Sequence, residues 1–143
     1  VEVEGIKGHQ DCKIDGVLVD CKSASGFAFK KFANNRLADD DPFGYIAQIS
    51  AYSEGNGVNE AYFLAIDKQH GNIALTRVHD MEMINAKERV QYLKKTLESK
   101  TVPDRCYSDI PEGSSGNRKL AIGCVFCPHK RFVLDTPNSQ NFR

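Results

Sequence analysis

Apolar and polar residues alternate along the first part of the chain, which is typical of β-strands. Residues 1–14 (VEVEGIKGHQDCKI) and 17–24 (VLVDCKSA) are rich in β-branched residues and predict two strands. The pair Asp15-Gly16 separates them, and Asp-Gly between such runs is a strong signal for a tight hairpin. Residues 59–78 predict a second hairpin, in which KQHGN forms the turn between two apolar runs.

Two later segments have helical spacing. Residues 41–55 (DPFGYIAQISAYSEG) predict a helix that Asp41 caps, with Pro42 in its first turn and Gly55 at its end. Residues 80–100 predict an amphipathic helix capped by Asp80, because apolar residues recur there every three or four positions: Met83, Ala86, Val90, Leu93 and Leu97. Residues 26–42 predict a short helix or a loop. The order of elements, β-β-β-α-β-β-α, predicts an α/β fold in which helices flank a central mixed sheet.

Composition limits the classes of function. The chain has 143 residues, 41% hydrophobic and 27% charged, which fits one domain over 1–134 and a flexible tail over 135–143. The formal net charge is zero, so any nucleic-acid partner must be held by local patches or by a metal. We expect no membrane partner, because no apolar run approaches the length of a span. The five cysteines, an odd number, favour a reducing compartment such as the cytoplasm.

The first hairpin carries the candidate chemistry. A two-residue turn at Asp15-Gly16 would place Asp11 opposite Asp20, with their Cβ atoms about 4.5–5.5 Å apart. Like charges at that separation destabilise a sheet, and a divalent cation such as Mg²⁺ or Mn²⁺ would compensate them. Lys22 follows on the same face, within reach of the same point. The alternative is an exposed polar face of an antiparallel sheet.

The same turn defines the two faces of the hairpin. The acidic face would hold His9, Asp11, Lys13, Leu18, Asp20 and Lys22. The opposite face is mostly apolar, and we expect it to pack on the core: Gln10, Cys12, Ile14, Val17, Val19 and Cys21.

Two motifs in this region resemble those of a nuclease superfamily. GHQD followed by DCK resembles the PD-(D/E)xK signature in its RecB-like exonuclease branch, and QISAY resembles the Gln-x-x-x-Tyr motif of the next helix. The resemblance implies a restriction-endonuclease-like core and a metal-dependent DNA nuclease of recombination, repair or degradation. It also implies that Asp11, Asp20 and the Cys21 carbonyl bind the metal, that Lys22 is the catalytic lysine, and that Gln48 and Tyr52 contact DNA and the active site. Family members often take a further ligand from an N-terminal helix, and because the chain opens at Val1 inside a predicted strand, we expect such a segment to be missing.

Residues after the second strand offer contacts to DNA. Ser23 and Ser25 could donate hydrogen bonds to phosphate, and Lys30 and Lys31 could pair with the backbone, although a solvated face explains the lysines equally well. The neighbouring Phe27, Phe29 and Phe32 could stack on bases, but core packing is the more common role of phenylalanine.

Three cysteines near the end of the chain form a separate candidate site. CVFCPHK places Cys124 and Cys127 two residues apart, with Cys106 upstream. The run resembles the end of the iron–sulfur subgroup of RecB-like nucleases and of phage-encoded exonucleases, but Val133 stands where the last cysteine is expected. A [4Fe–4S] cluster, a Zn²⁺ ion bound with His129, and a metal-free remnant all remain open.

Two other classes of function compete with the nuclease. One is a catalytically inactive module that keeps the fold and binds DNA or protein. The other is a zinc-ribbon adaptor centred on Cys124 and Cys127. Within the nuclease interpretation, the sequence leaves open exo- or endonuclease action, strand preference, oligomeric state and any recombination or repair partner.

Overall fold

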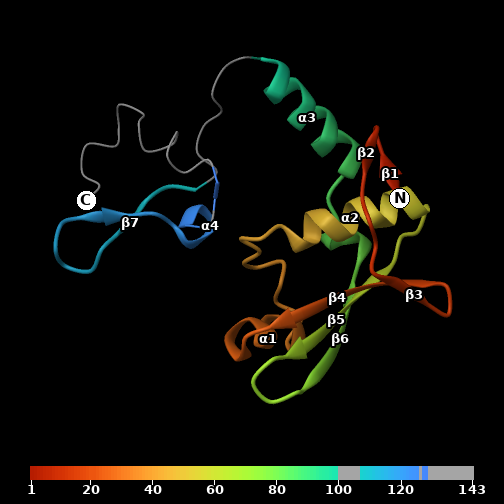
Figure 1. Cartoon of the computed structure of the whole chain (residues 1–143), viewed down its shortest axis with the longest axis horizontal. Helices are drawn as coiled ribbons and strands as arrows, with labels where there is room; N and C mark the ends of the chain where they lie inside the picture. Colours follow the sequence, from red (N-terminus) through yellow and green to blue (C-terminus); the bar gives the residue numbers. More distant parts are fainter. Residues whose placement is uncertain (100–106, 126, 129–143) are drawn as a thin grey trace. The chain divides into compact units, whose positions relative to one another are not determined.

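A computed structural model describes residues 1–99, 107–125 and 127–128 of the chain (Figure 1). The chain divides into two compact units, Val1–Lys100 and Thr101–Arg143. The first unit holds β1 (Glu2–Val3), β2 (Ile6–Lys7), β3 (Cys12–Ile14), β4 (Val17–Ala24), α1 (Gly26–Ala33), α2 (Tyr45–Asn56), β5 (Ala61–Asp67), β6 (Ile73–Val78), a 3₁₀ turn (Asp80–Glu82) and α3 (Ala86–Glu98). The second unit holds β7 (Ile110–Pro111), β8 (Arg118–Lys119) and α4 (Ile122–Val125).

The first unit is built on a four-stranded mixed sheet in the order β3-β4-β5-β6. Strands β4 and β5 are parallel, and the other two pairs are antiparallel. The crossover between the parallel strands contains α1 and α2, so the fold is α/β with helices flanking the sheet, as the sequence predicts. The second predicted hairpin is confirmed as β5 and β6.

The predicted turn of the first hairpin and the pairs nearest to it are confirmed, whereas the predicted pairing of Asp11 with Asp20 is not part of the ladder. Asp15 and Gly16 have φ values of 51° and 83°, the left-handed pair that a tight hairpin turn of the Asp-Gly type requires. Ile14 pairs with Val17, and Cys12 pairs with Val19. The ladder ends at Cys12, so Asp11 lies just beyond the paired part of β3.

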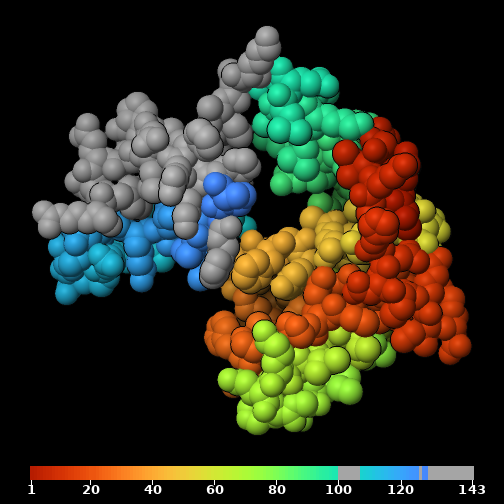
Figure 2. Space-filling model, in the orientation of Figure 1, coloured from red at the N-terminus to blue at the C-terminus, as the bar shows by residue number. Residues whose placement is uncertain are grey.

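The strand pattern predicted over residues 1–14 is divided among three short strands. Residues Glu4 and Gly5, with φ values of 49° and 77°, turn the chain into a separate two-stranded sheet of β1 and β2. Figure 2 shows this red N-terminal segment lying against the surfaces of α2 and α3, which β1 contacts. The chain then passes through residues 8–11 without sheet pairing before β3 begins.

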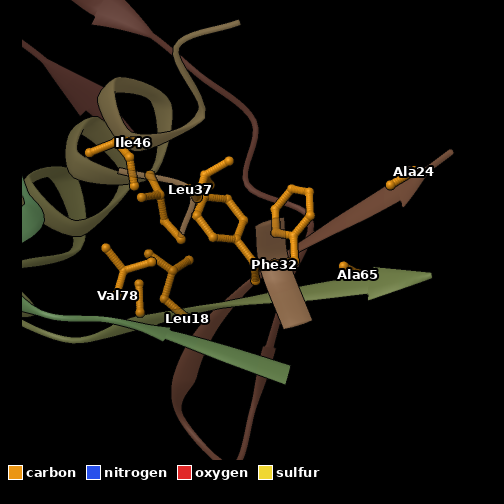
Figure 3. Close-up of a cluster of buried hydrophobic side chains, with 10 residues drawn as sticks. Leu18, Ala24, Phe32, Leu37, Ile46, Ala65 and Val78 are labelled. Atoms are coloured by element: carbon orange, nitrogen blue, oxygen red, sulfur yellow. The ribbon is translucent and has the colours of Figure 1, made fainter. Parts of the chain in front are cut away.

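The main core lies on the face of the sheet that the sequence predicts to be polar. On this face β4 buries Leu18, Asp20 and Ala24, whereas on the opposite face Val19 is buried but Ile14 and Val17 are exposed. The reason is that α1 and α2 both pack on the face that carries Leu18, as Figure 3 shows for Phe32 and Ile46 beside that strand. This core joins residues of three strands, both helices and the loop between them: Leu18, Ala24, Phe32, Leu37, Ile46, Ile49, Ala61, Phe63, Ala65 and Val78.

The helices differ from their predicted bounds at the capped ends. Helix α2 begins at Tyr45, but Asp41 still acts as its cap, because its two carboxylate oxygens accept hydrogen bonds from the N–H groups of Tyr45 and Ile46 at 3.0 and 2.8 Å. It ends at Gly57, which adopts the left-handed conformation, two residues after the predicted Gly55. Helix α3 is capped by Asn85, since Asp80 instead begins the 3₁₀ turn.

Part of the apolar stripe on α3 is not buried. Leu93 and Leu97 are exposed, although their spacing predicts a buried face. No helix within residues 1–99, 107–125 and 127–128 is long and apolar enough to cross a membrane. The predicted tail over 135–143 lies outside the described residues.

Candidate active site

A buried aspartate stands at the centre of the candidate site. Asp20 lies in the middle of β4, and only 1% of its surface is exposed. Its Oδ2 atom is fully enclosed and makes no well-aligned hydrogen bond within the described part of the chain. The Lys22 ammonium lies 2.7 Å from this oxygen as an ion pair. A buried carboxylate oxygen without a full set of hydrogen bonds is energetically costly, and here the Lys22 ammonium offsets part of that cost.

Lys22 connects this aspartate to helix α2. Its Nζ atom donates a hydrogen bond to Gln48 Oε1 at 2.8 Å and lies 4.8 Å from the centre of the Tyr45 ring. Gln48 Nε2 in turn donates to the Tyr52 hydroxyl at 3.2 Å. Gln48 and Tyr52 are one helical turn apart on α2, so a single helix face delivers both groups to the lysine.

Asp11 reaches the same place from the loop before β3. Its Oδ2 accepts a hydrogen bond from the backbone N–H of Cys21 at 2.7 Å. In an extended strand the N–H and C=O of one residue point to the same side, so the Cys21 carbonyl also projects toward Asp11. Asp11 therefore lies beside the backbone of Cys21 and near enough to Asp20 to influence the pKa of that carboxyl.

The pKa of Asp20 records this crowding. Burial raises the pKa of Asp20 above its usual range, and the neighbouring Asp11 carboxylate raises it further. The Lys22 ammonium acts in the opposite direction, but the net pKa of Asp20 is still raised. The two carboxylates are therefore neighbours, and one lysine lies between them and α2. A single lysine balances only part of their negative charge.

Cys21 contributes its backbone rather than its thiol. Desolvation raises the pKa of the Cys21 thiol, and the nearby Cys12, Asp11 and Asp20 raise it further. The thiol therefore stays protonated at neutral pH, which is not the form that attacks a substrate or binds a metal.

The residues present fit a hard divalent cation. Asp11 and Asp20 supply carboxylate oxygens, one of them enclosed and without an aligned donor, and the Cys21 carbonyl supplies a third oxygen. No group of three or more acidic, histidine or cysteine side chains that could hold a metal gathers within the residues that the structure describes. Mg²⁺ commonly takes only one or two protein carboxylates and completes its shell with water and substrate phosphate, so this small ligand set is sufficient.

A glycine allows α2 to approach the first strands. A Cβ atom on Gly8 would lie 2.9 Å from Cε1 of the Tyr52 ring, closer than packed atoms come. The Gly of the GHQD motif therefore makes room for the tyrosine of the QISAY motif. The sequence alone did not connect these two residues.

A cavity of about 230 Å³ adjoins the lysine. Three of the six residues predicted to contact DNA line it: Ser23, Ser25 and Lys31. Lys30 lines a separate hollow along α1, and Gln48 and Tyr52 line another one. Ser25 also caps α1, because its hydroxyl accepts a hydrogen bond from Ala28 N–H. Among the phenylalanines, Phe32 is buried and Phe29 packs against the core, whereas Phe27 is exposed.

Other residues that line the cavity were not predicted from the sequence. These residues are Phe43 and Tyr45 before and at the start of α2, Asp40 and Asp41 in the preceding loop, and Lys68 after β5. Lys68 reaches the cavity because β4 and β5 are parallel and end at the same edge, where Lys68 N–H donates to Ala24 C=O at 2.9 Å. If the parallel pairing of β4 and β5 could be predicted from the sequence, Lys68 would be placed beside the end of β4.

The cysteine site belongs to the second unit. Cys124 lies in α4 and Cys127 follows it, and both are free thiols. Cys106, His129 and Val133 lie outside the described residues, so the choice between an iron–sulfur cluster, zinc and no metal remains as the sequence leaves it.

Comparisons with known proteins add no assignment. No protein-family model, curated protein or solved structure matches this chain.

Proposed function

We propose that the chain is a metal-dependent DNA nuclease of the RecB-like branch of the PD-(D/E)xK superfamily, with a restriction-endonuclease-like core. The observation that carries the proposal is the convergence of residues from two distant motifs. Asp11, Asp20 and Lys22 of the hairpin meet Gln48 and Tyr52 of α2 through contacts of 2.7 to 3.2 Å. The two motifs lie 26 residues apart in the chain, yet Lys22 of one donates a hydrogen bond to Gln48 of the other.

The reaction is the hydrolysis of a phosphodiester. A water oxygen bonds to phosphorus, the bond from phosphorus to one ester oxygen breaks, and a proton lost by the water balances the one that the leaving oxygen takes up. Mg²⁺ or Mn²⁺ held by Asp11, Asp20 and the Cys21 carbonyl would polarise the water and neutralise developing charge.

The protein's own groups position the substrate and the lysine. Asp20 and Gln48 hold the Lys22 ammonium from two sides, so it can donate to the attacking water or to a phosphoryl oxygen without rearranging. Asp11 and Gln48 are exposed, so the phosphate can approach from their side while Asp20 stays buried. A cytoplasmic location with recombination or repair partners accords with this activity and with the free thiols.

The proposal is tested by digestion of end-labelled linear DNA and circular DNA with Mg²⁺, Mn²⁺ or EDTA. We expect cleavage with either cation, none with EDTA, and a rate that falls roughly 10²- to 10³-fold in Lys22→Met. Lys95→Met, an exposed lysine of α3, is the matched control and should retain full activity. Equal rates for Lys22→Met and the wild type would remove Lys22 from the mechanism, and cleavage in EDTA would remove the metal.

A further inference from the structure

The cavity beside Lys22 combines the features of a nucleotide subsite. Lys22 belongs both to the acidic pair's network and to the cavity wall, so the cavity begins where the reacting phosphate would lie. Its rim offers hydroxyls from Ser23 and Ser25 and ammonium groups from Lys31 and Lys68. These are the groups that bind phosphate and sugar without reading sequence.

Ion pairs engage two of the three lysines of the cavity. Lys31 pairs with Asp40 at 2.5 Å, and Lys22 pairs with the neighbouring Asp20 at 2.7 Å. Asp41, the other aspartate of the cavity, caps α2 with both oxygens. Lys68 has no acidic partner within the described residues. An anion entering the cavity can therefore pair with the ammonium of Lys68.

One wall of the cavity is aromatic. The Phe43 side chain is 59% exposed, and its ring centre lies 5.8 Å from that of Tyr45, with the planes inclined by 31°. Tyr45 is anchored in turn by Phe32 and Phe63 of the core, at 6.0 and 6.4 Å. An exposed ring that packs on a fixed one, in a cavity that Lys68 also lines, has the arrangement of a base-stacking platform.

The size of the cavity limits what can enter it. At about 230 Å³ it lies below the ~300–1,000 Å³ of typical small-molecule sites, so it leaves no room for a base pair. A nucleotide can enter such a space only when it is unpaired.

We infer that this cavity seats one nucleotide of a single strand, with Phe43 stacking on its base and Ser23, Ser25 and Lys68 contacting its backbone. The inference rests on the proposed function and narrows its substrate to single-stranded DNA or an unpaired end. Phe43 acts as a specificity-determining residue, since stacking on a base does not take part in the chemistry.

Binding measured without cleavage tests this inference. The full chain is titrated in EDTA against a fluorescently labelled single-stranded oligonucleotide and against a blunt duplex of the same sequence, followed by anisotropy. We expect tighter binding of the single strand. Phe43→Ala should weaken single-strand binding roughly 5- to 100-fold and leave duplex binding unchanged. Phe43→Tyr should restore it.

Leu75→Ala is the matched control, because Leu75 is 62% exposed on β6 and lines no part of this cavity. It should bind the single strand as the wild type does. Equal affinity for both DNA forms, or wild-type affinity in Phe43→Ala with an unchanged thermal unfolding curve, would overturn the inference. Metal-dependent cleavage alongside a neutral Phe43→Ala would sink this inference alone. Selective binding without any cleavage would sink the proposed nuclease and leave the nucleotide subsite standing.

Discussion

Lys22 is held from three directions, and this arrangement explains why a hairpin carries charged residues on its covered face. The Asp20 carboxylate, the Gln48 amide and the Tyr45 ring all contact its ammonium. Fixing a lysine side chain costs much conformational entropy, so a lysine held in one conformation indicates a functional role. Burying Asp20 costs still more free energy, because burial opposes the ionisation of its carboxyl group.

Gly8 gives the most direct test at the scale of a residue. Gly8→Ala would place a methyl group against the Tyr52 ring, which cannot move freely because it packs on the core. We expect the free energy of unfolding, measured in urea, to fall by about 1–3 kcal/mol. The cleavage rate should fall as well, because the Tyr52 hydroxyl accepts a hydrogen bond from Gln48. The control is Gly26→Ala, whose new Cβ would lie close to the flexible end of Gln69 and at an ordinary contact distance of 3.9 Å from Asp67 Oδ1. Full stability and activity in Gly8→Ala would contradict the packing described for this motif.

At the scale of elements, the hairpin illustrates what the sequence can and cannot reveal. Alternation and Asp15-Gly16 were enough to predict the turn and the pairing of Cys12 with Val19. They did not identify the buried face, because both faces of β4 carry apolar residues and the covered one is chosen by α1 and α2. Asp20 therefore lies under the helices, whereas Asp11 is exposed, and the packing of α2 on this face lets Gln48 reach Lys22.

The start of α2 provides a prediction at this scale. Gly44 at the N-cap position has no side chain, so Asp41 alone supplies the capping oxygens. Asp41→Ala should lower the free energy of unfolding by about 1 kcal/mol, and Asp41→Asn, which keeps one acceptor, should lose less. Chemical denaturation of the three proteins gives the comparison. An Asp41→Ala variant as stable as the wild type would show that the helix start does not depend on this carboxylate.

At the scale of the whole molecule, the parallel pairing of β4 and β5 is the feature that sequence analysis could not reach. Local patterns predict strands and turns, but the neighbour of each strand depends on long-range packing. That pairing brings Lys68 beside the end of β4 and so completes the cavity. The motif residues could be found because a short chain segment carries each of them, whereas Phe43, Tyr45 and Lys68 act together only in the folded unit.

The central claim is that Asp11 and Asp20 jointly bind a divalent cation beside Lys22. Isothermal titration with Mn²⁺ tests it on the wild type, Asp11→Asn, Asp20→Asn and the control Asp15→Asn, which changes an exposed carboxylate in the turn of the same hairpin. The account predicts saturable binding in the wild type and in Asp15→Asn, and its loss in both other variants. Wild-type titration curves in Asp11→Asn and Asp20→Asn would contradict it.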